Sequence, residues 1–390
     1  MEEILYRYNP WWEKKYELKE LYPRASILTL MKNNLTNKQV VFLTGLRRVG
    51  KTSLMRLLIK NLIDEEKIIP KNIFYVSMDD YVLGKKTIIE LLEEYRKIHE
   101  IRFQEKIFVF LDEITYQDNF ELQLKNIVDG QNVKIYASSS SASILKNKKV
   151  HLTGRNIIIE VLPLDFEEYL QFKKIILEKS NQHLVSKYFE NFMQNGGLPE
   201  YVMHNDIEYL KELVDDIIYK DIAAIHNLKN QQNLKDFFLL LMERAGKLVS
   251  INKVANILNI SADSAKRYLR LFEDTYLIHT VQRMGKINER IISPKKIYAA
   301  DLGIRALFTG LRDKGSFFEN YVYLKIKKQK PRYLLEKGVE IDFFTEKKVL
   351  IEVKYNSDLT EKQKKLCDKT KANKKITVKS VNDIKLLRNL

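Results

Sequence analysis

The segment GLRRVGKT, at positions 45–52, carries the clearest chemical signal in the sequence. It follows the apolar run QVVFLT, which is typical of a buried strand, and precedes SLMRLLIKNLI, which has helical spacing. Glycines in this pattern let backbone N–H groups surround phosphates, the lysine neutralises the β and γ oxygens, and the threonine binds magnesium. The start of the helix adds a favourable dipole. The residues predicted to bind the nucleotide are Gly45, Arg47, Arg48, Val49, Gly50, Lys51, Thr52 and Ser53.

Two carboxylates, Asp112 and Glu113, follow the apolar run IFVFL at 107–111. If this run is a strand of a parallel sheet, both carboxylates lie at its carboxyl end, beside the phosphate loop. We expect Asp112 to hold magnesium together with Thr52, and Glu113 to polarise the attacking water as a general base. Many strands end in acidic residues, so the phosphate loop upstream is what favours this interpretation. ATP and Mg²⁺ are therefore the predicted cofactors.

A run of serines ends the segment VKIYASSSS at 133–141. Ser138 or Ser139 could orient the γ-phosphate or the attacking water there, although a polar turn after a strand would have the same sequence. Arg155 is a candidate arginine finger that would act on the ATP of a neighbouring subunit; the alternative is a surface ion pair. The predicted catalytic residues are Lys51, Glu113, Ser138 and Arg155.

The elements needed to position these residues alternate along the first part of the chain. Strand patterns at 72–80, 106–113, 133–141 and 156–164 are separated by helical patterns, which predicts an α/β fold with a parallel sheet. After residue 164 the patterns become mainly helical, so we place a domain boundary there.

Two helices separated by a short turn are predicted within residues 251–278, in INKVANILN and ADSAKRYLRLFEDTYLI. Ser261 is a suitable N-cap for the second helix. The outward-facing Lys266, Arg267 and Arg270 are candidate DNA contacts, as expected of a recognition helix. The other interpretation is that this segment only packs between domains or subunits.

A hairpin is predicted by the strict alternation of EIDFFTEKKVLIEVKY, in which Asp342, Glu352 and Lys354 share one face. This is the D…E-x-K arrangement of restriction-like nucleases, in which two carboxylates bind magnesium and the lysine steadies the nucleophile. Alternating charges on a solvated hairpin would produce the same pattern.

The composition is basic, with 67 Lys and Arg against 51 Asp and Glu, a net charge of +16 and a pI near 9.4. This charge favours an anionic partner such as nucleic acid, but a lysine-rich composition explains it equally well. A single cysteine, Cys367, excludes an intramolecular disulfide, and no segment reads as a signal peptide or membrane span. We therefore expect a cytoplasmic protein with no membrane partner.

The order of GLRRVGKT, FLDEI, ASSSS, LTGR, VLPLDFEEYL and GGLPEYV resembles prokaryotic and archaeal AAA-type P-loop ATPases with a winged helix and a C-terminal restriction-endonuclease-like domain. The resemblance implies a homo-oligomer, a sensor serine, an arginine finger at Arg155, and Glu319 as a further acid of the nuclease-like site. Arg48 stands where the family more often has glutamine. The implied domains are a P-loop NTPase core at 1–164, a helical lid at 165–233, a winged helix at 234–284 and a restriction-endonuclease-like α/β domain at 285–390.

Together these features predict a magnesium-dependent ATPase that couples ATP binding and hydrolysis to DNA binding, translocation or remodelling. Two alternatives remain open. One is an ATP-regulated DNA nuclease that uses Glu319, Asp342, Glu352 and Lys354; the other is a nucleotide-dependent signalling switch.

Overall fold

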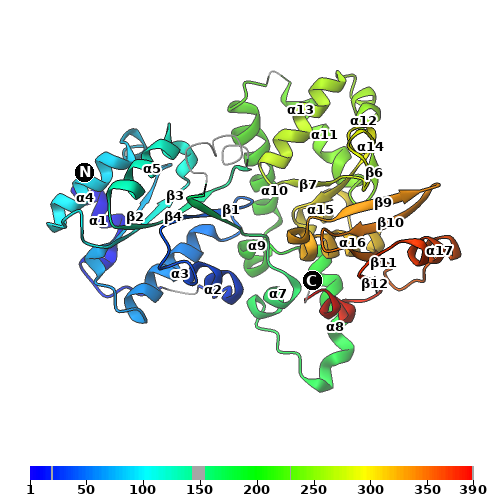
Figure 1. Cartoon of the computed structure of the whole chain (residues 1–390), viewed down its shortest axis with the longest axis horizontal. Coiled ribbons are helices and arrows are strands. Elements are labelled where there is room, and N and C mark those ends of the chain that lie inside the picture. Colours follow the sequence, from blue (N-terminus) through cyan, green and yellow to red (C-terminus); the bar gives the residue numbers. More distant parts are fainter. Residues whose placement is uncertain (19–20, 143–153, 229, 389–390) are drawn as a thin grey trace. The chain divides into compact units, whose positions relative to one another are not determined.

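The structure, a computed structural model, describes residues 1–18, 21–142, 154–228 and 230–388 (Figure 1). The chain forms two compact units, unit 1 at Met1–Val161 and unit 2 at Leu162–Leu390. Unit 1 ends close to the boundary predicted at residue 164. None of the helices within the described ranges is long and apolar enough to cross a membrane.

Unit 1 is built on a five-stranded parallel sheet with the order β2-β3-β4-β1-β5, which confirms the α/β prediction. The central strands read as continuous apolar runs because helices cover both faces of the sheet. Since β4 lies between β1 and β3, the carboxyl ends of these three strands are adjacent. The strands are β1 (Val40–Thr44), β2 (Ile73–Ser77), β3 (Ile107–Asp112), β4 (Val133–Ser139) and β5 (Asn156–Glu160).

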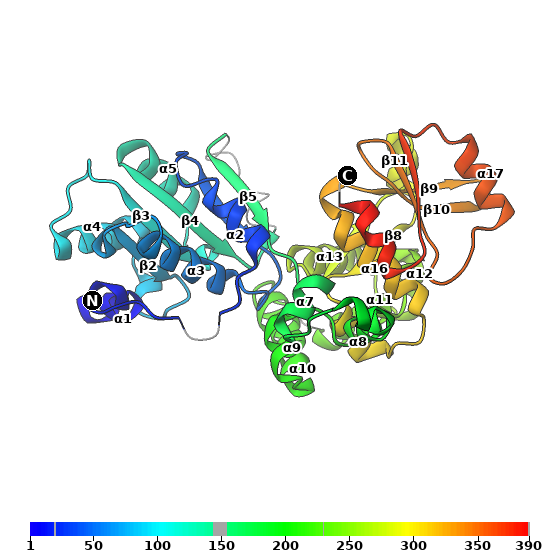
Figure 2. The ribbon, with the colours of Figure 1, turned by 90° about the horizontal axis from the view of Figure 1, so that it is seen from below.

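Two helical layers enclose this sheet, with α2 and α3 on one face and α4 and α5 on the other (Figures 1 and 2). Alternate side chains of the strands, such as Phe42 and Val109, pack with Leu91 and Leu124 in one buried cluster on the α4 and α5 face. The helices of unit 1 are α1 (Glu2–Tyr8), α2 (Ala25–Lys32), α3 (Lys51–Asp64), α4 (Ile88–His99) and α5 (Phe120–Gly130). Short 3-10 turns are η1 (Pro10–Trp12), η2 (Pro70–Asn72), η3 (Leu83–Lys85) and η4 (Ile114–Tyr116).

The edge strand β2 is covered by the N-terminal segment. Asn9, which is 0% exposed, donates from Nδ2 to Tyr75 O at 2.9 Å and accepts from Tyr75 N at 2.6 Å. The indole N–H groups of Trp11 and Trp12 both donate to Ile73 O, at 3.1 and 2.9 Å. These side chains satisfy backbone groups that would otherwise be free to pair with another strand.

Unit 2 contains two sheets, with strand orders β6-β8-β7 and β12-β11-β10-β9. Apart from the parallel pair β11 and β12, their strands pair antiparallel. The strands are β6 (Leu248–Val249), β7 (Ile278–Val281), β8 (Lys295–Ala299), β9 (Arg332–Glu336), β10 (Val339–Phe344), β11 (Val349–Val353) and β12 (Lys374–Val378).

The helices of unit 2 include the two predicted around residue 260, and Ser261 caps the second of them by accepting from Ser264 N at 3.0 Å. The helices are α7 (Phe166–Phe172), α8 (Val185–Asn195), α9 (Pro199–His204), α10 (Ile207–Asp216), the π-helix η7 (Ile217–Ala224), α11 (Gln231–Glu243), α12 (Ile251–Ile257), α13 (Ala262–Asp274), α14 (Ile287–Ile292), α15 (Leu302–Thr309), α16 (Lys314–Ile326) and α17 (Glu361–Lys369). Short 3-10 helices are η6 (Lys179–Leu184), η8 (Lys327–Gln329) and η9 (Val381–Leu387).

One buried cluster runs through much of unit 2. It joins Phe189 of α8, Tyr298 of β8, Tyr321 of α16 and Ile351 of β11. Elements from the regions predicted as lid and as nuclease-like domain therefore share a core. The finer division of unit 2 at residues 233 and 284 stays a prediction.

The glycine pair of the GGLPEYV motif has a structural role in unit 2. Gly197 N donates to the buried Asp301 carboxylate at 2.7 Å, and a Cβ at Gly197 would lie 2.1 Å from Leu164 O. Asp301 also caps α15 by accepting from Ile304 N at 3.0 Å. Burial raises the pKa of Asp301 to about 6. Close packing of Gly197 against Leu164 and its hydrogen bond to Asp301 therefore explain the glycine in this motif.

Replacing Asn9 should destabilise unit 1. Asn9→Ala leaves the N–H and C=O of Tyr75 buried and without the Asn9 side chain as a partner, which should cost about 2 to 5 kcal/mol of the free energy of unfolding. Urea unfolding followed by circular dichroism measures this loss. Gln104→Ala, at an exposed position of the same unit, is the control and should change stability by less than about 0.5 kcal/mol. Equal urea midpoints for the two variants would contradict the stabilising role of the Asn9 hydrogen bonds to β2.

Candidate active site

The phosphate-binding loop joins the end of β1 to the start of α3, as the sequence predicted. Its backbone is left-handed at Arg48, with φ 62°, and at Gly50, with φ 95°. Gly45 has φ 144°, and a Cβ there would lie 2.2 Å from Val161 O. Any side chain at this position would clash with Val161 O, so glycine is what allows the loop to turn sharply as it leaves the sheet.

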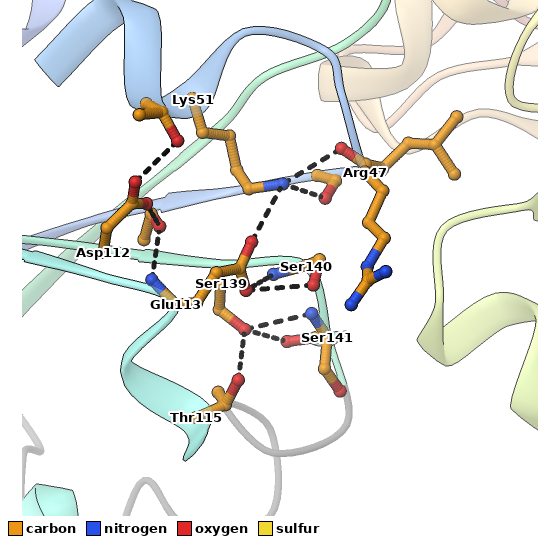
Figure 3. Close-up of polar contacts among 12 residues, drawn as sticks. Arg47, Lys51, Asp112, Glu113, Thr115, Ser139, Ser140 and Ser141 are labelled. Atoms are coloured by element: carbon orange, nitrogen blue, oxygen red, sulfur yellow. Dashed lines mark hydrogen bonds and ion pairs between the residues drawn. The ribbon is translucent and has the colours of Figure 1, made fainter. Parts of the chain in front are cut away.

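Lys51 lies at the centre of the site (Figure 3). Its ammonium donates to Gly45 O and Leu46 O, both at 3.0 Å, and lies 4.0 Å from Glu113 Oε1. The residue is only 5% exposed. The ammonium is thus held over the loop by carbonyl groups with which phosphate oxygens would compete.

Asp112 gathers hydroxyl groups from three other elements. Its Oδ2 accepts from Thr52 Oγ1 at 2.6 Å and from Tyr75 OH at 2.8 Å, and its Oδ1 accepts from Ser138 Oγ. Carboxylate and hydroxyl oxygens are the ligands that Mg²⁺ prefers, so these residues fit such an ion, with Thr52 and Asp112 as the ligands. Burial and the charge of Asp112 raise the pKa of Tyr75 well above its usual value, which keeps this phenol a donor.

Glu113 is fixed by the serines that follow β4. Its backbone N–H donates to Ser138 Oγ at 2.9 Å, and its Oε2 accepts from Ser140 N at 3.2 Å and Ser140 Oγ at 3.0 Å. Ser139 is directed elsewhere, toward Thr115 and Ser141 (Figure 3). Sequence reasoning named Ser138 and Ser139 as alternatives and missed Ser140 and Tyr75. The signal for Ser140 was the length of the serine run, and nothing marked Tyr75 within its apolar strand.

A cavity of about 640 Å³ opens beside the first turn of α3. Thr52 and Ser53 line it, together with the aromatic side chains of Trp11 and Tyr16. Its volume lies within the range of pockets that bind small molecules.

The other predicted nucleotide-site residues lie around the loop. Arg47 donates to Tyr116 OH at 3.3 Å, and Val49 O accepts from Arg24 at 3.3 Å. Arg155 is exposed and pairs with Asp129 at 3.2 Å. Its predicted role as an arginine finger stays a prediction, and Leu152 and Thr153 of the LTGR motif lie outside the described residues.

The candidate DNA contacts Lys266, Arg267 and Arg270 are all exposed on α13. Arg267 also donates to His226 O at 3.2 Å. On the opposite side of the helix Ala265, Tyr268, Leu269 and Phe272 are buried, as the helical spacing predicted.

The predicted nuclease residues lie together in unit 2. Asp342 and Glu352 face each other across β10 and β11, and Lys354 pairs with Glu352 at 2.9 Å. Glu319 of α16 reaches the same cluster through Lys296, which the sequence analysis did not single out. Burial and the neighbouring Asp342 raise the pKa of Glu352 to about 7.

A family model described as an AAA domain matches residues 37–170. It spans the phosphate loop, Asp112, Glu113 and the parallel sheet. The fold, the site and this match identify residues 37–170 as an AAA-type P-loop ATPase domain. A second family model, described as a domain of unknown function (DUF8612), matches residues 186–315 and crosses both boundaries predicted within unit 2.

The chain belongs to the same family as "Uncharacterized protein MJ1544" of Methanocaldococcus jannaschii. The two are 30% identical over 360 residues, which cover 87% of this chain and 79% of that protein. "Uncharacterized protein MJ1637" of the same organism is 26% identical over 388 residues, covering 87% of this chain and 80% of that protein. Among solved structures, the Walker-type ATPase PABY2304 of Pyrococcus abyssi has a TM-score of 0.44 and 13% identity, covering 76% of this chain and 99% of that one. At that score the likeness adds nothing to the assignment.

Ser138→Ala should reduce ATP hydrolysis without weakening nucleotide binding. The variant loses the donor to Asp112 and the acceptor for Glu113 N–H, so kcat should fall about tenfold to a hundredfold while the Kd for ATP changes little. Steady-state hydrolysis and equilibrium binding measure the two quantities. Ser26→Ala, at an exposed position of α2, is the matched control. Equal activity of both variants would exclude a positioning role for Ser138.

Proposed function

We propose that the protein is a magnesium-dependent ATPase that couples ATP binding and hydrolysis to binding and movement along, or remodelling of, DNA. The observation that carries the ATPase part is the meeting of Lys51, Thr52, Asp112 and Glu113 at one edge of the sheet. These side chains supply a phosphate partner, two metal ligands and a base within one site.

Each of these residues has a definable task in hydrolysis. Lys51 would leave its carbonyl partners for the β and γ oxygens of ATP. Thr52 and Asp112 would hold Mg²⁺, which when bound neutralises charge on the phosphates. Glu113, held by Ser140, would accept a proton from the attacking water.

The DNA part rests on α13 and on the net charge of +16. Two helices, α12 and α13, are followed by the antiparallel strands β7 and β8, an order of elements that supports a winged helix with α13 as the recognition helix. Lys266 and Arg270 are exposed on the face of α13 opposite its buried side chains.

The first test is ATP hydrolysis with Mg²⁺, alone and with single-stranded, duplex or branched DNA. One DNA form should stimulate hydrolysis, and Lys51→Ala should abolish it, which controls for contaminating ATPases. Hydrolysis that is indifferent to every DNA would instead favour a nucleotide-dependent switch.

Charge reversal on α13 should weaken DNA binding selectively. Lys266→Glu with Arg270→Glu should lower the affinity for the stimulating DNA about tenfold, and with it the stimulation, while basal hydrolysis is retained. Arg267 is left intact because it also contacts His226. The control is Lys179→Glu with Lys187→Glu, at two other exposed lysines of unit 2, which changes the net charge by the same amount. Fluorescence anisotropy measures the affinities; equal losses in both double variants would refute a specific role for α13.

We further propose that the protein works as a homo-oligomer in which Arg155 serves a neighbouring subunit. Arg155→Ala should then lower kcat about a thousandfold, and mixing it with Lys51→Ala should restore part of the activity, because the second variant supplies an intact arginine. Asp129→Ala breaks the same ion pair and is the control. A mixture no more active than its components would contradict action between subunits.

A further inference from the structure

The charged cluster of unit 2 has an unexpected centre. Its acidic members include Asp342, Glu352 and Glu319, the residues that a D…E-x-K nuclease would use to hold a divalent metal. At the middle of the cluster lies Lys296, which reaches it from β8 and whose side chain is 2% exposed.

The Lys296 ammonium is matched to three carboxylates. Its Nζ lies 2.8 Å from Glu319 Oε1, 2.8 Å from Asp342 Oδ1 and 2.5 Å from Glu340 Oε1. An ammonium carries three N–H donors, so this set of partners is the number it can satisfy. The positive charge that a shared metal would bring is thus already supplied by the chain.

The remaining oxygens of the central pair also have donors. Asp342 Oδ2 accepts from Val353 N at 2.9 Å, and Glu352 Oε2 accepts from Asp342 N at 3.0 Å. Glu352 Oε1 accepts from Gln363 Nε2 at 2.6 Å and pairs with Lys354 at 2.9 Å. Every carboxylate oxygen of this pair therefore has a hydrogen-bond donor or cation beside it.

Both side chains of the pair are also largely buried, with Glu352 lining a pocket of about 340 Å³. Asp342 is 7% exposed and Glu352 is 2% exposed, whereas a nuclease must bring a phosphodiester to its metal ligands. Among the residues that the structure describes, no three or more His, Cys, Asp or Glu side chains are arranged to hold a metal ion. The cluster therefore does not fit a nuclease metal site.

We infer that Lys296 takes the place of the divalent cation, so that this cluster binds no metal and cleaves no DNA. Its task is structural. Lys296 belongs to the sheet β6-β8-β7, whereas Glu340 and Asp342 belong to β10 of the sheet β12-β11-β10-β9, so the ammonium ties the two sheets together. This inference is independent of the proposed ATPase and DNA-binding activities.

The direct test compares the full-length wild type with Asp342→Asn by calorimetric titration of Mn²⁺ in the absence of nucleotide. The two isotherms should coincide, because weak binding near Asp112 is common to both proteins. The wild type should also leave supercoiled plasmid intact with Mg²⁺ or Mn²⁺. A Mn²⁺ site, or a cleavage activity, that disappears in Asp342→Asn would overturn the inference.

A second variant tests the position of the ammonium. Lys296→Ala leaves Glu319, Glu340 and Asp342 without their cation, so saturating Mn²⁺ should raise the unfolding midpoint of this variant by about 5 to 10 °C. The same concentration should shift the midpoint of the wild type only by the small amount that weak binding near Asp112 gives. No effect of Mn²⁺ on folded Lys296→Ala would contradict the assignment of a cation position.

Two controls make this rescue specific. Lys354→Ala removes the other lysine of the cluster but leaves Lys296 in place, so Mn²⁺ should stabilise it no more than it stabilises the wild type. Adding Asp342→Asn to Lys296→Ala should abolish the rescue; an unchanged rescue would place the ion elsewhere and overturn the inference. If Lys296→Ala does not fold, the comparison of the wild type with Asp342→Asn still decides the question.

Discussion

The parallel pairing of β3, β4 and β1 is the constraint on which the whole candidate site depends. In this order β4 runs between the strand that carries Asp112 and the strand that leads into the phosphate loop. Parallel strands end at the same edge, so a serine at the end of β4 can reach the acidic residues at the end of β3. Ser138 does so, since its hydroxyl accepts from Glu113 N–H and donates to Asp112. Displacing any one of these strands by a residue would separate groups that act only together.

The protein buries two central aspartates and satisfies them differently. Asp112, at 3% exposure, is surrounded by the neutral hydroxyls of Thr52, Tyr75 and Ser138. Asp342 is neutralised by the Lys296 ammonium. Hydroxyl groups can turn to share a carboxylate with an incoming cation, so the first environment remains able to bind a metal. An ammonium already carries the charge and is covalently attached, so the second environment favours permanent structure over exchange.

The sequence was most informative where backbone conformation and chemistry coincide. The loop at 45–52 needs glycine where the chain turns sharply and lysine where phosphate lies, so its motif predicted both the strand–loop–helix unit and the nucleotide site. The apolar runs predicted the sheet for a similar reason, since strands buried on both faces have little choice of residue.

Contacts between distant segments could not be predicted in this way. Tyr75 looks like any aromatic residue of a buried strand, and only the register of β2 against β3 brings its hydroxyl to Asp112. Lys296 lies 46 residues before Asp342, and no spacing rule joins them. The D…E-x-K pattern did predict which acids cluster, but a pattern of acids says nothing about the cation among them.

The cover that Asn9 and the tryptophans give to β2 has a consequence for biogenesis. Residues 1–12 leave the ribosome before Ile73–Ser77, so the partner of this strand edge is already present when the strand emerges, and a nascent chain need not expose it to its neighbours on a polysome.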